Sequence, residues 1–406
     1  MFLHKFIVHP NFFSIFYIGK CLKTRKIFSE SVRIIFDFNF LLEEFRPHIQ
    51  ALAPSAMPPN QNTPLSWKKV LINFCEILFL IGFVQLFTAL FGAANAVSAI
   101  STATALLLCT KLNLGVKNWQ SSLLIVFLFL VIPIFSHYSL IHPIAGIFIN
   151  FSAIFLLVIG TCQEYNSKIY LPFVVCYIFS QGTPVEGEVF TYRVIGMAAG
   201  GVLVGIVYLL CHLKQHSFPG IWTLCCGTHL ASKQIKFAFR LAFSLSIGML
   251  IGDLMDFPRS AWIGMTVNTL ILPVQEDMHK RLIPRVGANF IGCAVFFLVF
   301  QLLLPEHLFT IGLFFTSFFY MFARQYLWQQ VFVSINALVG GLVFFENSAP
   351  MTMGMRLMAV FVGVGVVLIT YLISHYLQPL DRVESLFYKW KRVHVIKQPK
   401  SNSHSA

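Results

Sequence analysis

Long apolar runs alternate with short polar stretches from about residue 70 to residue 377 of the chain. Each run is read as a helix long enough to cross the roughly 30 Å hydrocarbon core of a bilayer. The pattern therefore predicts an all-α polytopic membrane protein with about twelve transmembrane helices, over residues 70–90, 94–110, 120–137, 140–160, 167–182, 190–211, 235–255, 259–274, 283–304, 308–323, 326–345 and 355–377.

Composition supports this class. The chain is 57% hydrophobic and only 11% charged, whereas a soluble domain is nearer 25% charged. The formal net charge of +13 would favour nucleic-acid binding in a soluble protein. Lys and Arg held on the cytoplasmic side of a membrane explain the same sign. We expect no nucleic-acid partner.

The placement of Lys and Arg predicts the orientation. With the N-terminus inside, nine Lys and Arg fall in cytoplasmic loops and three, Arg193, Arg259 and Arg356, on the opposite side. Cytoplasmic loops of membrane proteins are enriched in these residues. We therefore expect a multi-pass protein of the bacterial inner membrane with both termini in the cytoplasm.

The predicted spans divide the chain into two halves. Arg193 and Arg356 each open a similar span 163 positions apart, which predicts two parallel six-helix repeats with a substrate path between them. The expected parts are a basic and polar leader (1–64), a first half (65–213), a cytoplasmic linker (214–234), a second half (235–380) and a basic tail (381–406). Residues 1–56 are expected not to be native, with translation starting at Met57.

One local pattern occurs three times: an arginine, then a small residue at +3 and glycine at +7. It is found at Arg193, Arg285 and Arg356. Small residues four apart share a helix face and let another backbone approach. The arginines either anchor the helix at the interface or attract an anionic solute. Arg285 is the strongest anion candidate, because it follows a helix-breaking Pro284 just after an expected charged turn, Gln275 to Arg281.

Three carboxylates are proton-coupling candidates. Asp253 and Asp256 are three residues apart at the outer end of one span, and Glu76 lies inside the first span. A neighbouring like charge or burial would favour the protonated acid. A solvated loop explains the two aspartates equally simply, and a magnesium–diphosphate site would need a second acidic cluster.

Other polar groups in the spans are candidates for substrate contact. Arg240 lies near the start of its span, where a guanidinium can bind a carboxylate with two hydrogen bonds or serve as an anchor. Trp262 marks a membrane interface or stacks on an aromatic solute. Asn268 and Asn289 are explained by hydrogen bonds between helices or by contact with the solute.

Cofactor chemistry finds little support. Cys211, His212, His216, Cys225, Cys226 and His229 do not follow zinc-site spacing. No phosphate-binding loop or nucleophile elbow is found. We expect no metal, no cofactor and no enzymatic activity.

The segment 237–292 resembles the fusaric acid resistance and aromatic acid exporter family. It has an arginine in its first span, Trp262 in the second, Pro273, and a third span opening with Arg285, Ala288 and Gly292. Residues 65–380 look like the family's two six-span halves. The family signature has Gly and Thr where this chain has Ala288 and Asn289. Larger members of the family carry a sizeable cytosolic helical domain. This chain has only residues 212–234 at that place, so it resembles a compact form without the domain.

The resemblance implies export of small anionic aromatic or amphipathic compounds, often with a periplasmic membrane-fusion adaptor. A homo-oligomer is also left open. Together with the arginines and carboxylates described above, the resemblance suggests efflux driven by the proton gradient. Two alternatives remain: a membrane enzyme acting on isoprenoid or lipid diphosphates, and a membrane scaffold that transports nothing.

Overall fold

The computed structural model describes residues 79, 82–110, 113–161, 169–213, 220, 233–273, 276–320, 322–323, 325–345 and 348–396. Within these ranges the chain is helical and has no strand. Glu76, the leader 1–64 and most of the linker fall outside them, so these predictions are untested.

The first half contains a helical segment over 82–91, the short η2 (Ala93–Asn95) and five further helices. These helices are α4 (Ala96–Cys109), α5 (Asn118–Tyr138), α6 (Pro143–Thr161), α7 (Tyr170–Gly182) and α8 (Gly187–His212). The helices follow the predicted spans because a helix satisfies the backbone hydrogen bonds of an apolar segment within that segment, as lipid requires.

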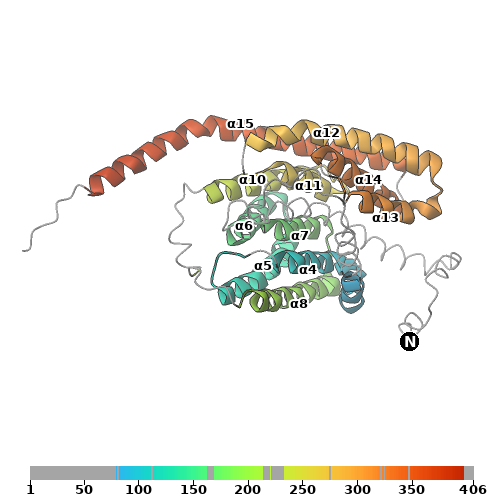
Figure 1. The fold of residues 1–406 in the computed structure, drawn as a ribbon, viewed down its shortest axis with the longest axis horizontal. Coiled ribbons are helices and arrows are strands. Elements are labelled where there is room, and N and C mark those ends of the chain that lie inside the picture. Colours follow the sequence, from blue (N-terminus) through green and yellow to red (C-terminus); the bar gives the residue numbers. More distant parts are fainter. Residues whose placement is uncertain are drawn as a thin grey trace, which may run out of the picture.

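The second half contains six α-helices and two short helical turns. They are α10 (Lys233–Leu254), α11 (Ser260–Leu270), α12 (Glu276–Phe296), η3 (Phe297–Leu303, a π-helical continuation of α12), η4 (Glu306–Leu308), α13 (Phe309–Tyr320), α14 (Tyr326–Phe345) and α15 (Ala349–Ile396). Figure 1 shows them as a bundle of roughly parallel rods, with the end of α15 projecting beyond it.

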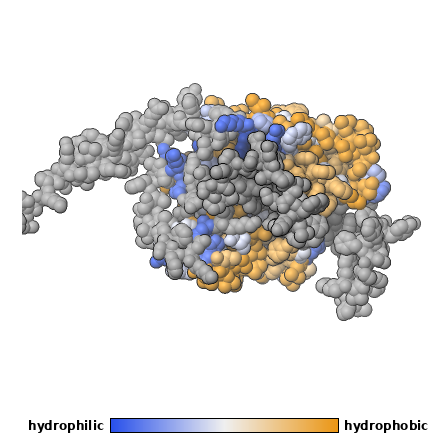
Figure 2. Space-filling view, viewed as in Figure 1, coloured by the Kyte–Doolittle hydropathy of each residue, from blue (hydrophilic) through white to orange (hydrophobic). Residues whose placement is uncertain are grey.

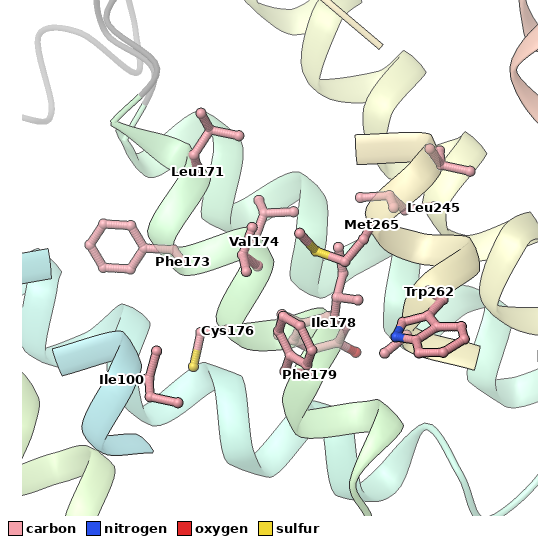
Figure 3. Packing of buried hydrophobic residues seen from close by; sticks show 14 of the residues in the cluster. Ile100, Leu171, Phe173, Val174, Cys176, Ile178, Phe179, Leu245, Trp262 and Met265 are labelled. Carbon is pink, nitrogen blue, oxygen red and sulfur yellow. The ribbon is translucent and has the colours of Figure 1, made fainter. Parts of the chain in front are cut away.

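Two helices form the centre of the molecule. In α7 every residue from Tyr170 to Gln181 is buried, and in α11 every residue from Ala261 to Leu270 is buried. Figure 3 shows α7 between Ile100 of α4 on one side and Trp262 and Met265 of α11 on the other. The two halves therefore meet along α7 and α11.

The central helix α11 is shorter than its predicted span. The sequence predicts a helix over 259–274, but α11 has 11 residues, or about 16 Å at the usual helical rise. It ends before Pro273, and Arg240 Nη2 donates hydrogen bonds to the carbonyls of Leu272 and Pro273 (3.0 and 3.2 Å). A helix enclosed by protein can end inside a membrane when protein groups satisfy its backbone.

The structure has a helix where the sequence predicted a charged turn before Arg285. Helix α12 begins at Glu276, so the segment from that residue to Arg281 is helical, and Pro284 lies inside the helix. Most of these charged residues have good helix propensity. Arg285 is therefore held in the third turn of a helix and does not open one.

Among the described residues, six helices are long and apolar enough to cross a membrane: Asn118–Tyr138, Pro143–Thr161, Gly187–His212, Lys233–Leu254, Lys280–Leu303 and Ala349–Ser374. Figure 2 shows hydrophobic residues covering the surface where Figure 1 places α12 to α14. Such a surface suits contact with lipid. The chain is an all-helical, multi-pass membrane protein, and the count of twelve spans remains a prediction.

One helix pairing recurs in both halves. A Cβ atom added at Gly363 of α15 would lie 2.7 Å from Thr266 Cβ of α11, and Gly200 of α8 is in equally close contact with Thr102 of α4. These glycines are 163 positions apart, as the proposed repeat requires. The pairing is consistent with two repeats, and the two-repeat arrangement remains a prediction.

Candidate functional site

A polar cluster lies inside the second half, among α11, α12, α14 and α15. Its centre is Asn289, whose Oδ1 accepts hydrogen bonds from Ser334 Oγ (2.8 Å) and Arg356 Nε (3.1 Å). Asn289 Nδ2 donates to the carbonyl of Arg285, one turn earlier on α12 (2.7 Å). We call Trp262, Arg285, Asn289, Ser334 and Arg356 the polar cluster.

Arg285 is the unusual member. Its exposed fraction is 0%, and its Nε, Nη1 and Nη2 are all buried without a hydrogen-bond partner in the part of the chain the structure describes. Burying an arginine in a membrane-spanning helix without a partner is costly, and such residues usually pair or mark a substrate path. A buried cation of this kind calls for an anion, and a guanidinium suits a carboxylate with two hydrogen bonds.

The ring of Trp262 is covered by cations. Arg259 Cζ lies 4.5 Å from its centroid and Arg356 Cζ lies 5.3 Å away. Both distances fit cation–π contacts. Arg259 also donates to the carbonyl of Gly341 (3.0 Å). Trp262 is 8% exposed, so its ring is enclosed by the protein and links Arg259 to Arg356 of the polar cluster.

Asn268 belongs to a different surface of α11. It is four residues beyond Gly264, which packs against Ile178 of α7, and residues four apart share a helix face. Both amide atoms of Asn268 are buried and have no hydrogen-bond partner among the described residues. The structure thus places Asn268 toward the first half and apart from Arg285.

Arg193 is fully engaged by the protein. Its Nε donates to Asn95 Oδ1 (3.1 Å), its Nη1 donates to the carbonyls of Ser180 and Thr183 (3.2 and 2.6 Å), and its Nη2 donates to the carbonyl of Ala94 (2.9 Å). These contacts tie the start of α4 and the end of α7 to α8. The geometry favours a structural role for Arg193 over contact with a solute.

Two more candidates have clear structural roles. Arg240 binds the carbonyls that follow α11, as described above. Asp256 is exposed and has a φ of 45°; its N–H donates to the carbonyl of Asp253, and that of Phe257 donates to Gly252. This pair of bonds is the Schellman ending of a helix. Asp256 therefore terminates α10 and points away from the protein interior.

Asp253 has a direct contact with the first half. Gln181 Nε2 of α7 donates a hydrogen bond to Asp253 Oδ2 of α10 (3.1 Å). Asp253 is partly exposed, whereas Gln181 is 1% exposed. The carboxylate is therefore accessible from the protein surface while it contacts the seam between the halves.

Sequence reasoning did not select Gln181, Ser334 or Arg259 as site residues. The sequence signal that could have selected Gln181 is that it is an amide inside a predicted membrane span. Gln330 also lies beside the polar cluster: its carbonyl accepts a hydrogen bond from Ser334 Oγ (2.8 Å), and its Oε1 is buried without a partner among the described residues.

The fold and the buried cations define a class: a multi-pass helical membrane protein with a polar cluster enclosed in one half. Residues 245–370 match the family model described as fusaric acid resistance protein-like. The resemblance predicted from the sequence is confirmed over this region, which contains the entire polar cluster and Asp253. The comparison with curated proteins and the comparison with solved structures give no match.

Proposed function

We propose that this protein is a bacterial inner-membrane exporter of small anionic aromatic or amphipathic compounds, driven by the proton gradient. A periplasmic membrane-fusion adaptor would carry the solute onward. The observation that carries the proposal is Arg285: a guanidinium at 0% exposure whose nitrogens lack hydrogen-bond partners in the described part of the chain. It lies within the region that matches the fusaric acid resistance protein-like family.

The surroundings of Arg285 suit an anionic ligand. Arg356 donates a hydrogen bond to the side chain of Asn289, which in turn donates one to the backbone carbonyl of Arg285. Ser334 and the amide of Gln330 add polar groups on α14. A bound carboxylate would offset the cost of the buried charge.

The site is enclosed in the present structure, so α12, α14 and α15 must move apart for a solute to enter. Alternating access of this kind is usual in secondary transporters. In the proposal Asp253 exchanges the driving proton, because it is the acid that contacts the seam between the halves.

Accumulation of fusaric acid and 4-hydroxybenzoate in cells tests the proposal. We expect cells with the wild-type protein to accumulate less of the acid, and an uncoupler to remove the difference. Arg285→Gln should abolish export at equal expression. Arg281→Gln is the matched control, because Arg281 is one turn earlier on α12 and contacts the ring of Tyr326 (4.9 Å).

Equal accumulation in all strains, with the adaptor supplied, would overturn the proposal for these acids. Export that survives in Arg285→Gln would exclude Arg285 as the anion site. Magnesium-dependent turnover of an isoprenoid diphosphate by the purified protein would favour the enzyme alternative.

A further inference from the structure

The side-chain amide of Gln181 can make more hydrogen bonds than the one that the structure shows. Its Nε2 donates to Asp253 Oδ2 at 3.1 Å. Its other atom, Oε1, is buried and has no hydrogen-bond partner in the part of the chain the structure describes. A buried amide oxygen without a partner is costly, and the adjacent carboxylate cannot satisfy it because an ionised carboxylate only accepts.

The position of Gln181 is fixed by its neighbours on α7. Arg193 binds the carbonyls of Ser180 and Thr183, immediately before and two residues after Gln181. A Cβ atom added at Gly182 would lie 2.7 Å from Ala261 Cβ of α11, so the backbones approach closely there. The amide is thus held at the seam between the halves.

The charged and titratable groups of the described residues around Asp253 are Asp256, Arg259 and Tyr177. Asp256 is exposed on the turn after α10, and Arg259 donates to the carbonyl of Gly341. Tyr177, one turn before Gln181, is buried and donates to Asn150 Oδ1 (2.7 Å). Gln181 donates the side-chain hydrogen bond that the structure shows on this carboxylate.

We propose that Gln181 is the positioning residue for Asp253, and that its amide binds the carboxyl group in both protonation states. With Asp253 ionised, Nε2–H donates to Oδ2, as observed. When water delivers a proton to the other carboxyl oxygen, the new O–H donates to Gln181 Oε1. The amide and the acid then share two hydrogen bonds in a ring.

Protonation would replace one charge-assisted hydrogen bond with two neutral ones and would satisfy the buried Oε1. Because that oxygen is costly without a partner, protonation would strengthen the contact between α7 and α10, and proton release would weaken it. With the orientation predicted from Lys and Arg, Asp253 lies at the periplasmic end. A proton taken up there after release of the solute would close the outer end of the path. This inference rests on the proposed proton-driven export and assigns a role to a residue outside the matched family region.

The test measures the contact and the transport separately. Infrared difference spectra of the purified protein in lipid, recorded between acidic and alkaline buffer, should contain a carboxylic C=O band that Asp253→Asn removes. In Gln181→Met we expect this band to move to higher frequency, because the acid loses its amide partner. Efflux by Gln181→Met should fall about tenfold, the size expected for one lost hydrogen bond to a charged group, with an altered pH profile.

Gln329→Met is the matched control, since Gln329 Nε2 of α14 donates to the carbonyl of Ala323 (3.0 Å) in the connection just before that helix. Thermal unfolding verifies that each variant is folded. An unshifted band in folded Gln181→Met, or an equal shift in Gln329→Met, would overturn the inference. A shifted band together with normal export by Asp253→Asn would instead overturn the proton-driven part of the proposed function.

Discussion

Arginines of similar sequence context have different roles in this protein. Arg193 and Arg285 both begin the same small-residue pattern, and both are buried. Arg193 makes four hydrogen bonds to protein oxygens, whereas the guanidinium of Arg285 makes none with the described residues. The spacing is the same, and the surrounding oxygen atoms decide the role.

This difference predicts opposite effects on stability. Arg193→Met should lower the free energy of unfolding by about 2–4 kcal/mol, because several charge-assisted hydrogen bonds are lost. Arg285→Met should be neutral or stabilising by about 1–4 kcal/mol, because it replaces a buried, unpaired cation with an apolar side chain. Thermal unfolding in lipid nanodiscs checks both. Equal destabilisation would show that Arg285 is structural.

At the scale of elements, the packing of α15 on α11 depends on single glycines. Gly363 faces Thr266 so closely that an added Cβ would lie 2.7 Å from the threonine Cβ. Gly365, two residues further along α15, has no atom within 4 Å of such a Cβ. Substituting Gly363 therefore tests helix packing, whereas substituting Gly365 tests helix propensity alone.

We expect Gly363→Ala to destabilise the protein by about 1–3 kcal/mol, the usual cost of overpacking. Gly365→Ala should be neutral or stabilising by up to about 1 kcal/mol, because alanine is the better helix former. The unfolding temperatures of the two variants in the same lipid give the comparison. A loss of stability of the same size at both positions would exclude the close contact as the cause.

For the whole molecule, the predicted orientation follows from charge. Lys and Arg gather at the ends of the helices that we place in the cytoplasm. Alkaline phosphatase fused after residue 140 should be active, and the same enzyme fused after residue 213 or at the C-terminus should be inactive. Green fluorescent protein fusions at these positions should give the reverse result. Activity after residue 213 would contradict the orientation.

The sequence by itself determined the class of the protein. Its apolar runs predicted the helices because a chain in lipid must satisfy its backbone within each helix. The small residues after Arg285 and Arg356 predicted close packing, and the segment around Arg285 predicted the family match that residues 245–370 confirm.

Only the tertiary structure decided which polar residues meet. Asn268 and Asn289 looked alike as amides in apolar spans, but α11 turns Asn268 toward the first half, while Asn289 binds Ser334 and Arg356 in the polar cluster. Asp253 and Asp256 looked like a pair, yet the helix ends between them and only Asp253 reaches Gln181. Hydrogen bonds between helices distant in the chain depend on how the helices pack, and local spacing does not encode that packing.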